Sequence, residues 1–69
     1  MSRILKDPEK ILAALEMYTY EKQLTQTELA KRLGVSLPAV NGWLLGKREP
    51  RRFILYRIQK FLQKEGFLK

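Results

Sequence analysis

The types and spacing of the polar side chains in this chain favour binding of a polyanion and not catalysis of a reaction that makes or breaks covalent bonds. Its 69 residues include no cysteine and no histidine, which excludes disulfides, thiolate nucleophiles, imidazole bases and zinc sites built on those residues. Three of the seven acidic residues, Asp7, Glu9 and Glu28, lie at predicted helix starts, where a carboxylate stabilises the first turn. No nucleophile or glycine-rich phosphate loop accompanies the others. We therefore expect no enzymatic activity, no cofactor, no metal and no small-molecule substrate.

The basic residues are concentrated in the last third of the chain. The net charge is +7, with six Lys or Arg against five acids in residues 1–46 and eight against two in residues 47–69. Four of the cations in the second segment lie close together: Lys47, Arg48, Arg51 and Arg52. Such a cluster favours nucleic acid or an anionic membrane face as the partner, and a solubilising surface is the alternative.

Residues 25–33 predict a short helix, which would position some of the polar side chains. Thr25 and Glu28 form a T-x-x-E capping box, in which each side chain accepts a hydrogen bond from the backbone of the other residue. The helix then runs over 26–33, where apolar residues recur at the spacing of one buried face. Gly34 follows and ends the helix, because a left-handed C-cap is strained for a residue that has a Cβ.

A second helix is predicted over 37–45. Ser36 is its N-cap, and a proline in its first turn breaks no intrahelical hydrogen bond. Its buried side comprises Val40, Trp43 and Leu44. This leaves four residues for contacts outside the core: Leu37, Pro38, Asn41 and Gly42. Among these, Asn41 has the one side chain that can form two hydrogen bonds with the edge of an adenine.

The remaining segments complete an all-α domain over 1–69. They are an N-terminal arm (1–7), a first helix from Pro8 to about Lys22, a basic loop (47–50), a C-terminal helix (51–65) and a tail (66–69). No repeat and no strand pattern of useful length interrupts them. These segments predict a single domain of four helices.

This arrangement resembles the Cro and lambda-type repressor family of phage and bacterial helix-turn-helix proteins. The resemblance covers roughly residues 10–62 and is carried by an unbroken pattern: Leu24 to Ala30, Gly34 to Ser36, Val40, Trp43, Gly46 to Arg48, Pro50, Leu55 and Ile58. It implies a compact lambda-repressor-like fold of four or five helices. It also implies a sequence-specific regulator, specifically a Cro-like repressor, that reads the major groove of double-stranded operator DNA with the helix over 37–45.

The resemblance also implies which residues contact DNA. Family members use a glutamine at the position of Gln26 both to hold a phosphate and to support base reading. On this pattern, the base contacts are Gln26, Ser36, Leu37, Pro38, Asn41 and Gly42. The phosphate contacts are Thr25, Lys47, Arg48, Arg51 and Arg52, because the corresponding loop in the family lies against the sugar–phosphate backbone.

The predicted reading helix departs from the family, because it has few hydrogen-bonding side chains. Leu37, Pro38 and Ala39 offer apolar contact with thymine methyl groups, and Gly42 permits a close backbone approach to the groove. This low polarity keeps a second interpretation open. The chain would then be an antitoxin or adaptor-type helical protein-interaction module, with secondary or no DNA binding.

The tail is the expected dimer surface. Relatives commonly bind DNA as two-fold dimers, and only residues 66–69 follow the last predicted helix. If the chain forms a homodimer, in solution or only on DNA, the expected contact is Phe67 and Leu68 with part of the last helix or the loop before it.

Membrane insertion is not expected. No apolar run reaches the ~20 residues that a membrane span requires, and charged residues interrupt the N-terminal segment. We expect no membrane partner and a cytoplasmic location, in a bacterium or in an infected host cell.

Overall fold

Four α-helices form the described part of the chain. The computed structural model describes residues 7–69, so most of the predicted N-terminal arm lies outside the described residues. The helices are α1 (Pro8–Glu21), α2 (Gln26–Leu33), α3 (Leu37–Leu44) and α4 (Arg52–Lys64). Compared with the prediction, α3 ends one residue earlier and α4 is one residue shorter at each end. The all-α class is confirmed, and no strand occurs in residues 7–69.

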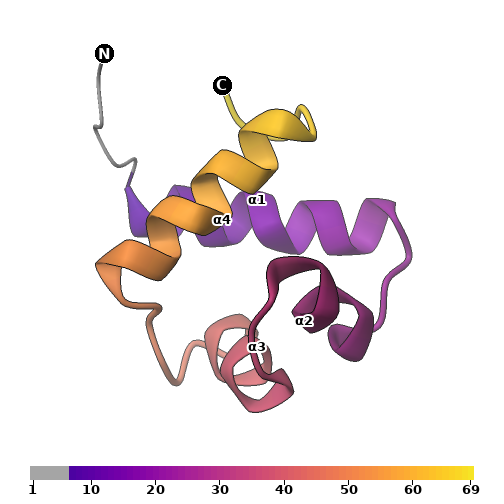
Figure 1. Cartoon of the computed structure of the whole chain (residues 1–69), viewed down its shortest axis with the longest axis vertical. Helices are drawn as coiled ribbons and strands as arrows, with labels where there is room; N and C mark the ends of the chain where they lie inside the picture. Colours follow the sequence, from indigo (N-terminus) through magenta and orange to yellow (C-terminus); the bar gives the residue numbers. More distant parts are fainter. Residues whose placement is uncertain (1–6) are drawn as a thin grey trace.

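The other helices pack around α1. In Figure 1, α1 crosses the middle of the molecule, with α4 crossing it on one side and α2 and α3 on the other. Helix α1 contacts α3 and α4, while α2 contacts α3 and α4. Helices α2 and α3 therefore lie together as a pair at one end of the molecule. No helix in residues 7–69 has the length and apolar character needed to cross a membrane.

Local capping fixes the start of α1 and the end of α4. At the start of α1, a carboxylate oxygen of Asp7 accepts the backbone N–H of Glu9 at 2.9 Å, and Pro8 occupies the first helical position. At the end of α4, the N–H of Phe67 returns to the carbonyl of Leu62 at 2.8 Å. This backward bond satisfies a carbonyl that the helix would otherwise leave unpaired, and it folds the tail toward the core.

The core combines one face of each helix, and Tyr18 of α1 is among its largest fully buried side chains. The Tyr18 ring meets Phe61 and Phe67 edge-on, with ring centroids 5.2 and 5.1 Å apart. Its hydroxyl accepts a hydrogen bond of 2.8 Å from the guanidinium of Arg32. A buried tyrosine hydroxyl needs such a partner. The bond therefore joins α1 to α2 while it satisfies the one polar atom of this side chain.

A second arginine joins α4 to the end of α2. The guanidinium of Arg57 donates a hydrogen bond of 3.0 Å to the carbonyl of Leu33. That carbonyl belongs to the last turn of α2, where carbonyls lack helical partners and the helix dipole is negative. Arg57 therefore holds the turn between α2 and α3 against α4.

Candidate nucleic-acid interface

The turn between α2 and α3 is built by side chains that cap both helices. The hydroxyl of Thr25 accepts the N–H of Glu28 at 3.1 Å, and the carboxylate of Glu28 accepts the N–H of Thr25 at 2.8 Å. Gly34 adopts a φ of +73° as the C-cap of α2. The hydroxyl of Ser36 then accepts the N–H of Ala39 at 3.3 Å and starts α3. Both helices of the motif therefore begin, and α2 also ends, at locally determined positions.

The start of α2 holds a negative charge in place. The pKa of the Glu28 carboxyl is lowered, first by the backbone N–H of Thr25 and next by its hydroxyl, both of which bond the carboxylate. The positive charges of Arg32 and Lys31 lower this pKa further. The ionised form also suits the positive end of the α2 dipole. The capping box is therefore fully formed at neutral pH.

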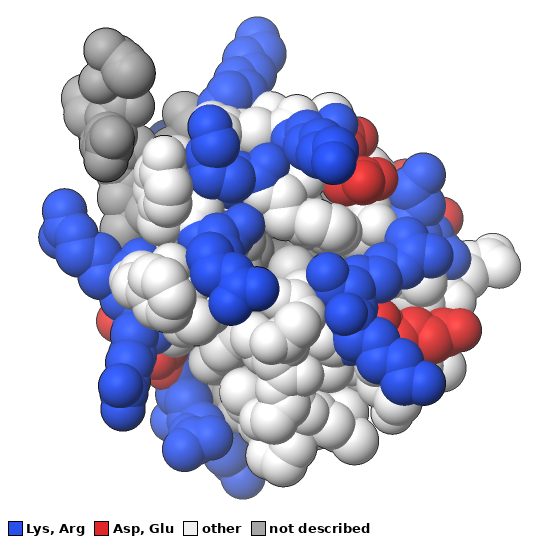
Figure 2. Space-filling view, viewed as in Figure 1, with Lys and Arg blue, Asp and Glu red and all other residues white. Residues whose placement is uncertain are grey.

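Helix α3 presents an uncharged face to the outside. Val40 and Trp43 are buried, whereas Leu37, Pro38 and Asn41 are exposed. Figure 2 shows that the surface over α3 carries neither acid nor base, and that Lys and Arg side chains gather on either side of it. A helix of this kind can enter a groove between two phosphate backbones without placing a charge at the groove floor, while the flanking cations face the phosphates.

The structure brings Gln26 and Asn41 together, two residues predicted separately as base contacts. The side-chain NH₂ of Asn41 donates a hydrogen bond of 3.0 Å to the side-chain oxygen of Gln26, across 15 positions of sequence. One amide acceptor and one amide donor are thereby used. The NH₂ of Gln26 and the oxygen of Asn41 keep their own capacity to bond a ligand. The pair therefore presents both a donor and an acceptor where α2 meets α3.

The hydroxyls of Thr25 and Ser36 lie at the helix starts, and both residues are exposed. Each hydroxyl accepts a backbone N–H as a cap. A hydroxyl that accepts a bond still has its own proton to donate. The proton of the Thr25 hydroxyl is directed at the Glu28 carboxylate, so of the two hydroxyls it is that of Ser36 that can donate to a phosphate or a base.

Gly42 differs from the prediction, since it is buried instead of facing outward. The side chain of Arg48 covers it: a Cβ added to Gly42 would lie 2.6 Å from Cδ and 2.9 Å from Cγ of Arg48. The sequence pattern placed Gly42 on the outward side of α3, along the edge that Arg48 covers. It could not show that the loop after α3 returns over this edge.

The basic residues predicted as phosphate contacts lie in sequence on both sides of one buried residue, Pro50. Lys47, Arg51 and Arg52 are exposed, as is Arg48, whereas Pro50 is buried. Burial of Pro50 holds the loop on the core and leaves the cations on its outer side. The four cations predicted as phosphate contacts are therefore all open to solvent.

The apolar tail folds back on its own chain. Phe67 packs edge-on against Tyr18, and both Phe67 and Leu68 are partly buried against the core. Part of the apolar area of the tail is thereby covered within one chain, and the dimer contact at Phe67 and Leu68 stays a prediction. The covering follows from the backward hydrogen bond at the end of α4, which turns the tail inward.

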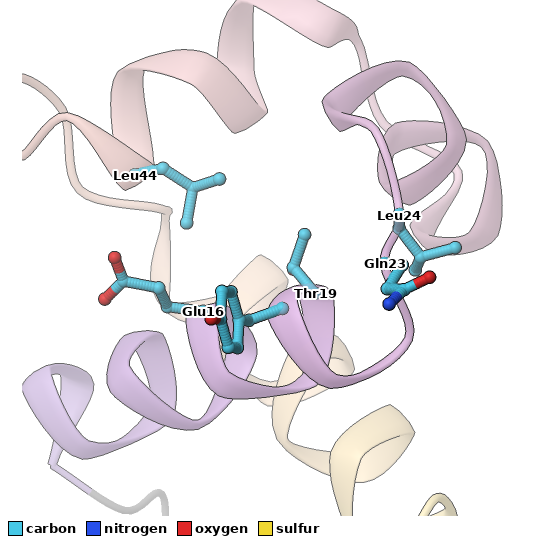
Figure 3. A pocket seen from close by; sticks show the side chains of 6 residues that line it. Glu16, Thr19, Gln23, Leu24 and Leu44 are labelled. Atoms are coloured by element: carbon cyan, nitrogen blue, oxygen red, sulfur yellow. The ribbon is translucent and has the colours of Figure 1, made fainter.

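Sequence reasoning missed a hollow between α1 and the end of α3, of about 600 Å³. Figure 3 shows Glu16 and Thr19 on α1 facing Leu44 of α3, with Gln23 and Leu24 at the adjoining turn. The sixth lining residue, Tyr20, is 81% exposed. No sequence pattern signals this hollow, because it depends on the spacing between two helices.

Comparison with known sequences supports the same motif. A sequence model of the helix-turn-helix family matches residues 10–66. Comparisons with curated proteins and with solved structures found no significant match. The family match includes α2, α3 and the turn between them, together with α4 and nearly all of α1. The chain therefore belongs to the Cro/C1-type helix-turn-helix family of DNA-binding regulators.

Proposed function

We propose that this DNA-binding regulator is a Cro-like repressor that reads the major groove of a specific operator with α3. The observation that carries the proposal is the uncharged exposed face of α3 with a polar pair at its edge, Gln26 and Asn41, and exposed cations beside it. A major groove is wide enough to admit one α-helix, and its floor displays donors, acceptors and methyl groups. The composition of α3 suits a floor rich in methyl groups.

Two kinds of contact read the bases: hydrogen bonds from the Gln26–Asn41 pair, and apolar contacts from Leu37 and Pro38. Asn41 and Gln26 contact base edges through the amide atoms that their mutual hydrogen bond leaves available. Leu37 and Pro38, both exposed, contact thymine methyl groups, and Ser36 donates from the helix start. Because these apolar contacts discriminate less than paired hydrogen bonds, part of the specificity would come from DNA shape.

Affinity comes mainly from phosphates. The four loop cations contact the backbone beside the groove, and Thr25 adds a contact at the start of α2. Each cation that neutralises a phosphate releases a counterion, which makes binding strongly dependent on salt. Phosphate contacts also fix the register of α3 on the duplex.

The test is selection of bound sequences from a random duplex library at fixed salt. We expect recovery of a defined site containing A·T pairs, and a two-fold symmetric site would indicate that two copies bind together. Recovery of unrelated sequences despite measurable binding would contradict base reading by α3.

A second candidate function is protein binding as an antitoxin or adaptor-type module, with DNA contact secondary or absent. The observation that favours it is the small number of hydrogen-bonding side chains on the exposed face of α3, where Leu37 and Pro38 flank Asn41. The same selection separates the two functions. Absence of duplex binding at low salt would favour protein binding over DNA binding as the function of this chain.

A further inference from the structure

The loop after α3 crosses back over that helix at Gly42. Built on the backbone, a Cβ at position 42 would lie 2.6 Å from Cδ, 2.9 Å from Cγ and 3.3 Å from Cβ of Arg48. These atoms form the part of the arginine side chain nearest its backbone. Rotating the far end of the side chain cannot move all of them away. A methyl group at position 42 would therefore displace Arg48 or the loop that carries it.

Gly42 also holds the backbone of the loop. Its carbonyl accepts the N–H of Lys47 at 2.9 Å and the N–H of Arg48 at 3.2 Å. The side chain and the backbone of Arg48 are thus both fixed on one residue of α3. Arg48 is attached to the helix and is not a freely moving loop cation.

Glycine is required at position 42 because there is no room for a side chain, and not because the backbone conformation excludes other residues. Gly42 lies inside α3, and it is not among the residues with positive φ. Any residue can adopt its conformation, and glycine weakens a helix interior relative to alanine. The close approach of Arg48 is the feature that an alanine would disturb.

The contact lies at the edge of the exposed face of α3. Gly42 is one helical turn after Pro38, so the two residues lie on the same side of α3. Pro38 is exposed. The Arg48 side chain is therefore held directly beside the surface assigned to the major groove.

We propose that Gly42 is a positioning residue for DNA binding: its missing side chain lets Arg48 lie against α3, and this contact aims the Arg48 guanidinium at a phosphate beside the groove. The inference rests on the proposed function. It adds that a residue with no side chain, and no contact with DNA, controls one of the phosphate contacts.

The first experiment needs no DNA. We would measure thermal unfolding of Gly42→Ala in the parent chain and in an Arg48→Ala background. The second background removes Cγ and Cδ and leaves only the milder Cβ contact at 3.3 Å, so the alanine should raise Tm there by up to about 4–8 °C through its better helix propensity. In the parent the same change should leave Tm unchanged or lower it. Equal increases in both backgrounds would overturn the steric coupling.

The second experiment measures duplex binding against salt for the same four proteins. Gly42→Ala and Arg48→Ala should each weaken binding by about tenfold and reduce the slope of log K against log salt by about 0.9. The double variant should lose no more than Arg48→Ala alone. Arg52→Ala is the matched control, because Arg52 is exposed on α4 and its loss should add to that of Gly42→Ala.

The outcomes separate this inference from the proposed function. If the parent binds duplex DNA and Gly42→Ala binds with the same affinity and slope, the positioning role is wrong while the function stands. If losses from Gly42→Ala and Arg48→Ala add, the two residues act separately and the inference is also wrong. If the parent binds no duplex, the proposed function fails together with the DNA part of the inference, and the thermal cycle still decides the steric coupling.

Discussion

Asn41 donates its side-chain hydrogen bond to Gln26 at 3.0 Å, so the exposed face of α3 and the first residue of α2 share one polar contact. The bond restricts the rotation of both side chains before any ligand arrives. Ordering a long side chain on binding costs about 0.5–1.5 kcal/mol, and a pair that is already ordered avoids part of this cost. The same bond makes the two residues one unit, since removing either changes the orientation of the other.

The first prediction concerns this pair. Asn41→Ala should cost about 1–3 kcal/mol of affinity for the selected site and little for scrambled duplex. The reason is that a base contact contributes to sequence specificity, whereas a phosphate contact contributes affinity for any sequence. Gln26→Ala should show the same preference, and the double variant should lose less than the sum of the single losses. Competition titrations at fixed salt measure these affinities. Lys64→Ala, at the exposed end of α4, is the control, and equal losses on both duplexes for Asn41→Ala would refute base reading.

The second prediction concerns the salt dependence of the parent protein. If Lys47, Arg48, Arg51 and Arg52 each contact a phosphate, log K should fall against log salt with a slope of about −4 per chain. Fluorescence anisotropy with a labelled duplex over a range of salt concentrations gives this slope. A flat response at low ionic strength would show that the basic loop does not bind the backbone.

The third prediction assigns Trp43 to the core. Trp43 is 7% exposed and belongs to the buried cluster, so Trp43→Ala should cost about 3 kcal/mol or more of unfolding free energy through the cavity it leaves. Phe53→Ala is the matched aromatic control, because Phe53 is 67% exposed and should change stability by less than about 0.5 kcal/mol. Urea unfolding measures both. A Trp43→Ala protein that unfolds like the parent but binds DNA less tightly would place this ring at the interface.

The fourth prediction isolates the hydrogen bond between α1 and α2. Tyr18→Phe keeps both ring contacts but removes the hydroxyl that Arg32 bonds at 2.8 Å. The expected loss is about 1 kcal/mol of unfolding free energy. Tyr20→Phe, at an exposed position, should be neutral. Equal stability of Tyr18→Phe and the parent would mean that solvation of Arg32 replaces this bond without cost.

The fifth prediction follows from the lowered pKa of Glu28. A carboxylate whose pKa is lower in the folded than in the unfolded state adds stability above its unfolded pKa and loses it as pH falls through the folded pKa. Glu28→Gln keeps an acceptor for the N–H of Thr25 but has no titrating charge. The parent should therefore be the more stable protein at neutral pH, and its advantage should shrink in acid. If the difference in unfolding free energy between the parent and Glu28→Gln stays constant down to acidic pH, the effect comes from the geometry of the side chain and not from its charge.

The helix-turn-helix could be predicted from sequence because its boundaries are set by residues close to one another. Thr25 and Glu28 are three positions apart, and Gly34 directly follows the helix that it ends. Capping and the spacing of apolar residues act within one or two turns, so they are visible in the chain itself. The same reasoning correctly placed Trp43 inside and Asn41 outside.

The contacts that build the interface depend on how the helices pack. Gln26 meets Asn41 across 15 positions, Arg57 meets Leu33 across 24, and both contacts need the observed placement of α2 against α3 and α4. The covering of Gly42 by Arg48 needs the loop to fold back over α3. A linear pattern gives the side of a helix on which a residue lies, but it does not give the path of a loop or the distance between two helices. Packing of the whole core fixes both quantities, and it thereby determines which predicted contact residues face the outside.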